Sequence, residues 1–168
     1  MEVYRSDPPT RRTTDRIKVG IADLAVGDRE SRLSTSGLGS CVGIALHDAD
    51  AGISGLAHAM LPAGEGKSDE AKYVDTALHA LVAKMEGEGA SRRRIRAKLA
   101  GGSTMFEFDS TNESVGERNV TAARQTLAVL DIPLDAEDVG GEHGRSLELD
   151  GETGDLHVRS ASAGEHTL

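Results

Sequence analysis

The chain of 168 residues is long enough for one domain and too short for two of ordinary size. Its 28 acidic and 19 basic residues give a formal net charge of −9, which argues against nucleic acid as a partner because phosphate binding needs a basic face. No apolar run approaches the roughly 20 residues of a membrane span, and the N-terminal residues lack the apolar region of a secretory signal. The single cysteine excludes an internal disulfide. We therefore expect a cytoplasmic protein that is not inserted in a membrane.

Two features of the composition indicate a halophilic source. Aromatic residues make up only 2% of the chain, and its 14 arginines and 5 lysines are together outnumbered by acidic residues. A carboxylate-rich surface is tolerated in concentrated salt, because ions screen the repulsion between like charges.

Taken in chain order, the first half is expected to consist mainly of strands. Residues 1–15 show no hydrophobic periodicity, and we expect them to form a flexible N-terminal tail ahead of a domain over 16–160. Within that domain the expected elements are strand 16–26, a Gly/Ser loop over 35–40, strand 41–47, turn 48–51 and strand 52–61.

The second half combines helices and strands. Apolar residues at helical spacing predict a helix from 71 that ends before Gly87, and the pair Ser114 and Glu117 fits the capping box of a second helix that ends before Pro133. The remaining expected elements are strand 95–100, a hairpin of strands 146–150 and 155–159, and a flexible C-terminal tail over 161–168. This order predicts an α/β or α+β layered domain.

The only cysteine lies at the start of the predicted hairpin, where its partner can be derived. If the turn covers 48–51, His47 pairs with Gly52 and Cys41 stands directly opposite His58, with Cβ atoms about 4.5–5.5 Å apart. A thiol beside an imidazole is the minimal equipment for nucleophilic catalysis, since the imidazole stabilises the thiolate. The alternative is that Cys41 is a small buried hydrophobe and His58 a core residue with satisfied hydrogen bonds.

The alternation of the hairpin also predicts its two faces. The side chains expected to face the core are the apolar ones of Val42, Ile44, Leu46, Ile53 and Ala57. On the other face, Gly43 and Ala45 are expected to leave open space beside Cys41 for a substrate. A register shift of one residue would place Cys41 and His58 on opposite faces.

Further candidates concern the loop before the cysteine and bound groups. The main-chain N–H groups of Gly39, Ser40 and Cys41 are candidates for an oxyanion hole. The six histidines show no zinc-site spacing, and no phosphate-binding loop is present, so we expect neither a metal nor a cofactor.

Several motifs in order resemble the chemoreceptor glutamine deamidase (CheD) family. They begin with Leu38-Gly-Ser-Cys41 and Ala57-His58-Ala-Met-Leu-Pro62, and continue with Val115-Gly-Glu-Arg-Asn-Val120 and Asp138-Val-Gly-Gly141. The likeness covers roughly residues 17–160. Together with the composition, it indicates a halophilic archaeon as the source.

The resemblance implies an α/β sandwich, a single domain with a mixed β-sheet and two main helices. It also implies that Cys41, His58 and Thr35 form the catalytic group, and that the reaction converts glutamines of methyl-accepting chemotaxis receptors to glutamate with release of ammonia. A CheC-type chemotaxis phosphatase is the implied partner. Two alternatives stay open: a methylesterase that acts on receptor glutamyl methyl esters at the same site, and a non-catalytic regulator of the phosphatase.

A possible partner surface is predicted by the only two phenylalanines of the chain. Phe106 and Phe108 are separated by one residue in a polar stretch, so they point to the same side of an extended segment. We expect at least one of them to be an exposed apolar anchor for the phosphatase.

The charge balance makes a prediction about stability. Because the folded chain repels itself, we expect its melting temperature to rise steeply from dilute buffer to molar salt, as measured by circular dichroism in NaCl. A melting temperature that stays constant over this range would refute the halophilic interpretation.

Overall fold

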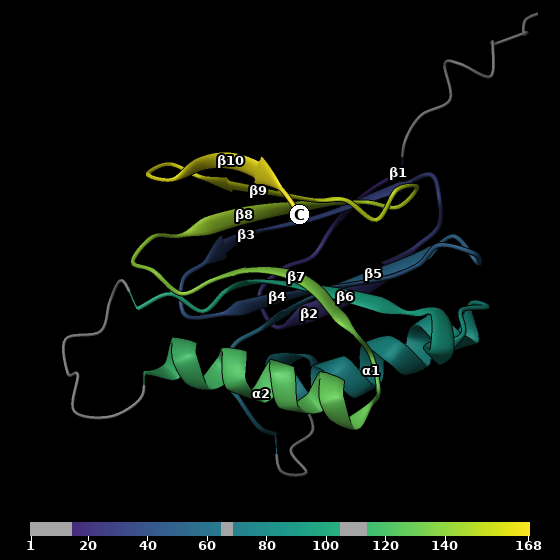
Figure 1. The fold of residues 1–168 in the computed structure, drawn as a ribbon, viewed down its shortest axis with the longest axis horizontal. Coiled ribbons are helices and arrows are strands. Elements are labelled where there is room, and N and C mark those ends of the chain that lie inside the picture. Colours follow the sequence, from purple (N-terminus) through teal and green to yellow (C-terminus); the bar gives the residue numbers. More distant parts are fainter. Residues whose placement is uncertain (1–14, 65–68, 105–113) are drawn as a thin grey trace, which may run out of the picture.

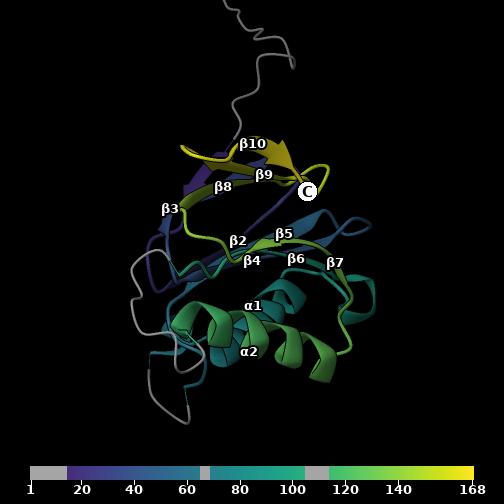
Figure 2. The ribbon, with the colours of Figure 1, turned by 60° about the vertical axis from the view of Figure 1, so that its left-hand side comes forward.

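A computed structural model describes residues 15–64, 69–104 and 114–168 (Figure 1). Two five-stranded β-sheets face each other, and two helices cover one of them on the face turned away from the other sheet (Figures 1 and 2). The predicted α/β layered domain with two main helices is confirmed. Neither these helices nor the short ones in the described ranges are long and apolar enough to cross a membrane.

We call the sheet away from the helices the outer sheet and the sheet against them the inner sheet. The outer sheet contains, in spatial order, β1 (Asp15–Lys18), β3 (Ser31–Leu38), β8 (Arg145–Asp150), β9 (Leu156–Ser160) and β10 (Gly164–Thr167). The inner sheet contains β2 (Asp23–Gly27), β5 (Ile53–Ala59), β4 (Val42–Asp48), β6 (Arg96–Gly101) and β7 (Leu134–Val139). The helices are α1 (Val74–Gly87) and α2 (Val115–Val129), with short 3-10 turns η3 (Glu70–Lys72) and η4 (Arg92–Arg94).

Both sheets are mixed. β1 and β3 are parallel, as are β6 and β7, whereas the other described pairs are antiparallel. The crossover between β6 and β7 passes through α2, which accounts for the parallel pairing because parallel neighbours need a long connection.

Two apolar clusters hold the three layers together. One lies between the inner sheet and the helices and contains the predicted core residues Val42, Ile44, Leu46, Ile53 and Ala57. The other lies between the two sheets and includes Leu33, Leu56 and Leu147. All seven residues of β5 are buried because this strand has a layer on each face.

Two segments near the N-terminus differ from the sequence prediction. The single strand expected over 16–26 is divided into β1 and β2 by a turn at Ala22, whose φ is +59°, and the chain passes there from the outer sheet to the inner sheet. The loop expected over 35–40 is mostly strand, since β3 extends to Leu38. The glycines and serines that suggested a loop produce a register irregularity between Thr35 and Leu38, with φ +77° at Gly37.

Two further strands were not predicted. β7 is an edge strand with three acidic side chains, so its apolar alternation is weak. The expected tail over 161–168 includes β10, which pairs with β9, and Leu168 exchanges main-chain hydrogen bonds with Leu156. All four β10 residues are exposed, so hydrophobic patterning gave no signal for this strand. The predicted N-terminal tail lies outside the described residues except for Asp15, which begins β1.

The hairpin of β4 and β5 is confirmed, but its register differs from the prediction by two residues. His58 lies opposite Gly43 instead of Cys41. A shift of two preserves the face on which every side chain lies, because the side-chain period of a strand is two. The expected open space beside Gly43 is wrong: the outer sheet packs there, and a Cβ atom on Gly43 would collide with Leu147.

The predicted capping box is confirmed and generates a stability prediction. The Glu117 amide donates to Ser114 Oγ over 3.0 Å, and the Ser114 amide donates to Glu117 Oε1 over 3.0 Å. Ser114→Ala should therefore lower the free energy of unfolding by about 1 kcal/mol in urea denaturation, because an amide at the helix N-terminus loses its acceptor. An unchanged unfolding midpoint would show that the cap does not stabilise α2.

Candidate active site

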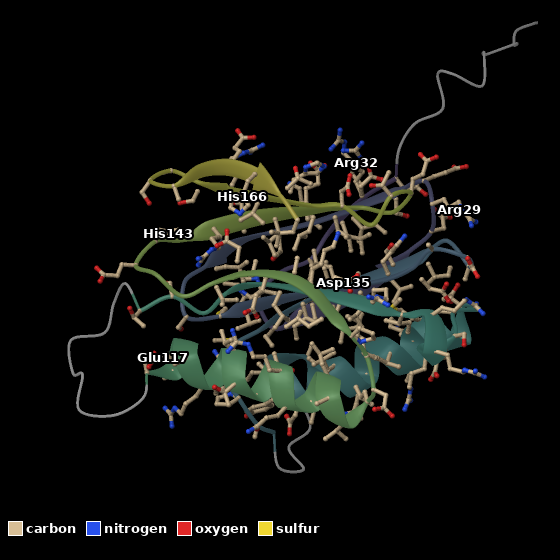
Figure 3. All side chains as sticks on the ribbon, viewed as in Figure 1. Arg29, Arg32, Glu117, Asp135, His143 and His166 are labelled. Atoms are coloured by element: carbon tan, nitrogen blue, oxygen red, sulfur yellow. The ribbon has the colours of Figure 1, made fainter. Side chains whose placement is uncertain are left out.

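The predicted site residues gather at one end of the sandwich. The β7–β8 connection and the N-terminal end of α2 lie at this end, where Figure 3 shows His143 and Glu117, with Arg29 at the opposite end. β3, β5 and β6 all end here, and β4 begins here. Side chains from both sheets can therefore approach one another at this edge.

Thr35 and His58 are joined by a hydrogen bond between the two sheets. Thr35 Oγ1 lies 2.7 Å from His58 Nδ1, and both side chains are buried. Thr35 faces inward from β3 with Leu33, and His58 faces inward from β5 with Leu56. The main chain at His58 is fixed as well, since its carbonyl accepts from the Ala22 amide over 2.9 Å and it pairs with Asp23 of β2.

Cys41 lies on the same face as His58, one step before β4 begins. Its side chain packs at the margin of the cluster between the sheets and is partly exposed. Because His58 stands opposite Gly43, Cys41 and His58 are diagonal neighbours on one face, a spacing of about 7–8 Å that long or aromatic side chains can bridge. His58 Nε2 is buried and has no hydrogen-bond partner among the described residues. The other ring nitrogen, Nδ1, is the one that bonds Thr35.

The loop before Cys41 is held through its carbonyl groups. The Gly39 carbonyl accepts from the Ser103 amide over 2.8 Å, and the Cys41 carbonyl accepts from the Gly102 amide over 2.8 Å. The Ser40 carbonyl accepts from the side chain of Asn119 over 2.8 Å. Because these carbonyl groups point at buried donors, the N–H groups of the same peptide units point the opposite way.

Burial favours the neutral form of both titratable groups of the site, the Cys41 thiol and the His58 imidazole. It raises the pKa of the Cys41 thiol, against a smaller lowering by a hydrogen bond from the Cys41 main-chain amide. It also lowers the pKa of the His58 imidazole. The resting site therefore favours a thiol and a neutral imidazole over the thiolate that the sequence analysis assumed.

Of the three predicted catalytic residues, Thr35 and His58 are hydrogen-bonded to each other, and Cys41 lies on the same face of the inner sheet as His58. Gly39 and Ser40 lie in the adjoining loop, as expected. Phe106 and Phe108, the predicted partner anchors, lie outside the described residues. Sequence reasoning gave no role to Asn119, although a polar residue inside the apolar face of a predicted helix was a usable signal.

Comparison with known proteins identifies a family and several relatives. A family model described as "CheD chemotactic sensory transduction" matches residues 60–160. A Haloarcula marismortui protein named "Probable chemoreceptor glutamine deamidase CheD" is 42% identical over the whole length of both chains. The chain belongs to the CheD family. The resemblance given by the sequence motifs is therefore confirmed.

Further CheD relatives come from bacteria as well as archaea. A Halalkalibacterium halodurans protein named "Chemoreceptor glutamine deamidase CheD" is 47% identical over 92% of this chain and 99% of its own length. A Bacillus subtilis protein of the same name is 41% identical over 90% of this chain and 95% of its own length.

The pKa directions predict how Cys41 reacts with an alkylating reagent. The rate of reaction with iodoacetamide should keep rising with pH beyond about 8.5, the pKa of a free cysteine, because burial disfavours the thiolate. The measurement is unambiguous since the chain has one cysteine, and a short cysteine peptide is the control. A rate that is already constant at neutral pH would instead reveal a thiolate–imidazolium pair.

Proposed function

We propose that this CheD-family protein deamidates glutamine side chains of chemotaxis receptors, with Cys41 as nucleophile, His58 as general base and acid, and Thr35 as the residue that orients His58. The observation that carries the proposal is the buried 2.7 Å hydrogen bond between Thr35 Oγ1 and His58 Nδ1, with the only cysteine of the chain on the same face as His58. The names of the relatives supply the substrate class.

The first step forms a thioester. Cys41 Sγ attacks the carboxamide carbon of the glutamine while the thiol proton passes to His58 Nε2, and the carbonyl oxygen becomes an oxyanion. The main-chain N–H groups of the loop Gly39–Cys41 donate to this oxyanion. As the intermediate collapses, the imidazolium gives its proton to the departing nitrogen, and ammonia leaves.

The second step hydrolyses the thioester. His58 Nε2 takes a proton from a water molecule, whose oxygen attacks the acyl carbon. Collapse of this intermediate breaks the carbon–sulfur bond and returns the proton to Cys41. The net change is glutamine plus water to glutamate plus ammonia, so the group is ready for another cycle.

The mechanism uses Thr35 as a hydrogen-bond acceptor for one tautomer of the imidazole. His58 Nε2 can accept a proton only when the ring hydrogen lies on Nδ1, and Nδ1–H then donates to Thr35 Oγ1. The hydroxyl carries no charge, so it orients the ring and stabilises the imidazolium less than a buried carboxylate would. Burial of His58 lowers its pKa and so favours the unprotonated form of the base.

The proposal extends to location and partner. The protein acts in the cytoplasm and binds a CheC-type chemotaxis phosphatase, with Phe106 and Phe108 as the candidate contacts. Family membership supports the location and the phosphatase, whereas the two contacts rest on the spacing of the phenylalanines in the sequence, since both lie outside the described residues.

Two variants test the proposal by mass spectrometry of receptor peptides that contain glutamine. Cys41→Ala should fold normally and show no deamidation above a blank without enzyme. Thr35→Val keeps the shape of the side chain and removes one hydrogen bond, so it should lower kcat about tenfold. Deamidation by pure Cys41→Ala protein would eliminate Cys41 as nucleophile.

The same assay separates the alternative functions. Methylated receptor peptides that lose methanol while glutamine peptides stay unchanged would show a methylesterase. Wild-type protein that changes neither peptide would favour a non-catalytic regulator of the phosphatase.

A further inference from the structure

Asn119 is a fully buried polar side chain on the inner face of α2. It lies beside Gly116, Val120 and Ala123 on the face that packs against the inner sheet. Its Nδ2 donates two hydrogen bonds, to the Ser40 carbonyl over 2.8 Å and to the Met60 carbonyl over 2.9 Å. Since both acceptors are carbonyl oxygens, the orientation of the amide group is determined.

These two bonds connect the strands where their regular pairing stops. The last pair of the β4–β5 ladder is Val42 with Ala59, so the next positions are Cys41 and Met60. The Met60 amide donates to the Lys72 carbonyl, away from β4. Beyond the ladder, the Asn119 amide group bridges the chain before Cys41 and the chain after His58.

The bond to Ser40 also fixes the amide of the nucleophile. The Ser40 carbonyl and the Cys41 N–H belong to one planar trans peptide unit and point in opposite directions. Of the three loop carbonyls described above, that of Ser40 is held by a side chain, whereas those of Gly39 and Cys41 are held by main-chain amides. Rotation of the Ser40–Cys41 peptide unit would break its bond to Asn119.

We propose that Asn119 is a positioning residue, which holds the Ser40–Cys41 peptide unit so that the Cys41 N–H is directed at the oxyanion of the reacting carboxamide. The role in catalysis rests on the proposed deamidase function. A purely structural role would instead require only that Asn119 satisfies two buried carbonyls and thereby stabilises the fold.

Kinetics of Asn119→Ala and a matched control distinguish the two roles. Leu127→Ala, two turns further along α2, removes core packing from the same helix without touching Ser40 or Met60. With folded protein, Asn119→Ala should lower kcat by about 100-fold, the usual effect of losing one oxyanion donor, and change KM by less than about threefold. Leu127→Ala should retain the wild-type kcat. Equal kcat values for the two variants would overturn the proposal.

A second readout does not depend on deamidation. Labelling with [15N]cysteine gives one amide resonance, because the chain has one cysteine. The resonance should move in Asn119→Ala and stay in place in Leu127→Ala, since Asn119, unlike Leu127, donates to the carbonyl of the Cys41 peptide unit. An unmoved resonance in Asn119→Ala would contradict the proposal, even if the wild-type protein deamidates no receptor peptide.

A third variant tests the proposal in case Asn119→Ala does not fold. Asn119→Asp preserves the size of the side chain and replaces the N–H groups that donate to Ser40 and Met60. If Asn119→Ala does not fold, Asn119→Asp should show a resonance displaced from the wild-type position and a kcat lowered by about 100-fold. A folded Asn119→Asp protein with the wild-type resonance and kcat would overturn the proposal.

Discussion

The hydrogen bond between Thr35 and His58 crosses from the outer sheet to the inner sheet at the edge where both sheets end. It exists only if the sheets pack at the right separation and the side chains of β3 and β5 face one another. Small side chains on the inner sheet allow this packing, as at Gly43, where Leu147 of the outer sheet takes the space of a side chain. The outer sheet, which lies away from the helices, therefore supplies Thr35, the residue that is hydrogen-bonded to His58.

Cys41 is held by other elements of the fold. The loop before Cys41 depends on donors from the end of β6 and from α2, through Gly102, Ser103 and Asn119. Glycines are needed at the end of β6, where φ is +112° at Gly101 and +66° at Gly102. Gly116 of α2 packs against the main chain of Gly102 and Ser103, with no room for a Cβ atom. One sheet thus orients His58, while a helix and a strand end hold the loop that carries Cys41.

The sequence was sufficient to predict the helices, the hairpin of β4 and β5 and the face shared by Cys41 and His58, because each rests on local periodicity. The register of the hairpin was wrong by two residues, yet the shared face survived because the error was even. Strand β10 could not be predicted, since exposed residues carry no hydrophobic alternation. The role of Thr35 came from family resemblance alone, because its contact with His58 joins residues on different sheets. Asn119 was missed for the same reason, since its two acceptors lie 79 and 59 residues earlier in the chain.

The most direct test of this account is the protonation state of the His58 ring in the resting protein. NMR of protein labelled with 15N in the histidine rings, assigned through His58→Asn, reports which nitrogen carries hydrogen. The account predicts a neutral ring at neutral pH, with hydrogen on Nδ1 and a free lone pair on Nε2, and a loss of this preference in Thr35→Val. A ring protonated on both nitrogens, or one with hydrogen on Nε2 alone, would contradict it.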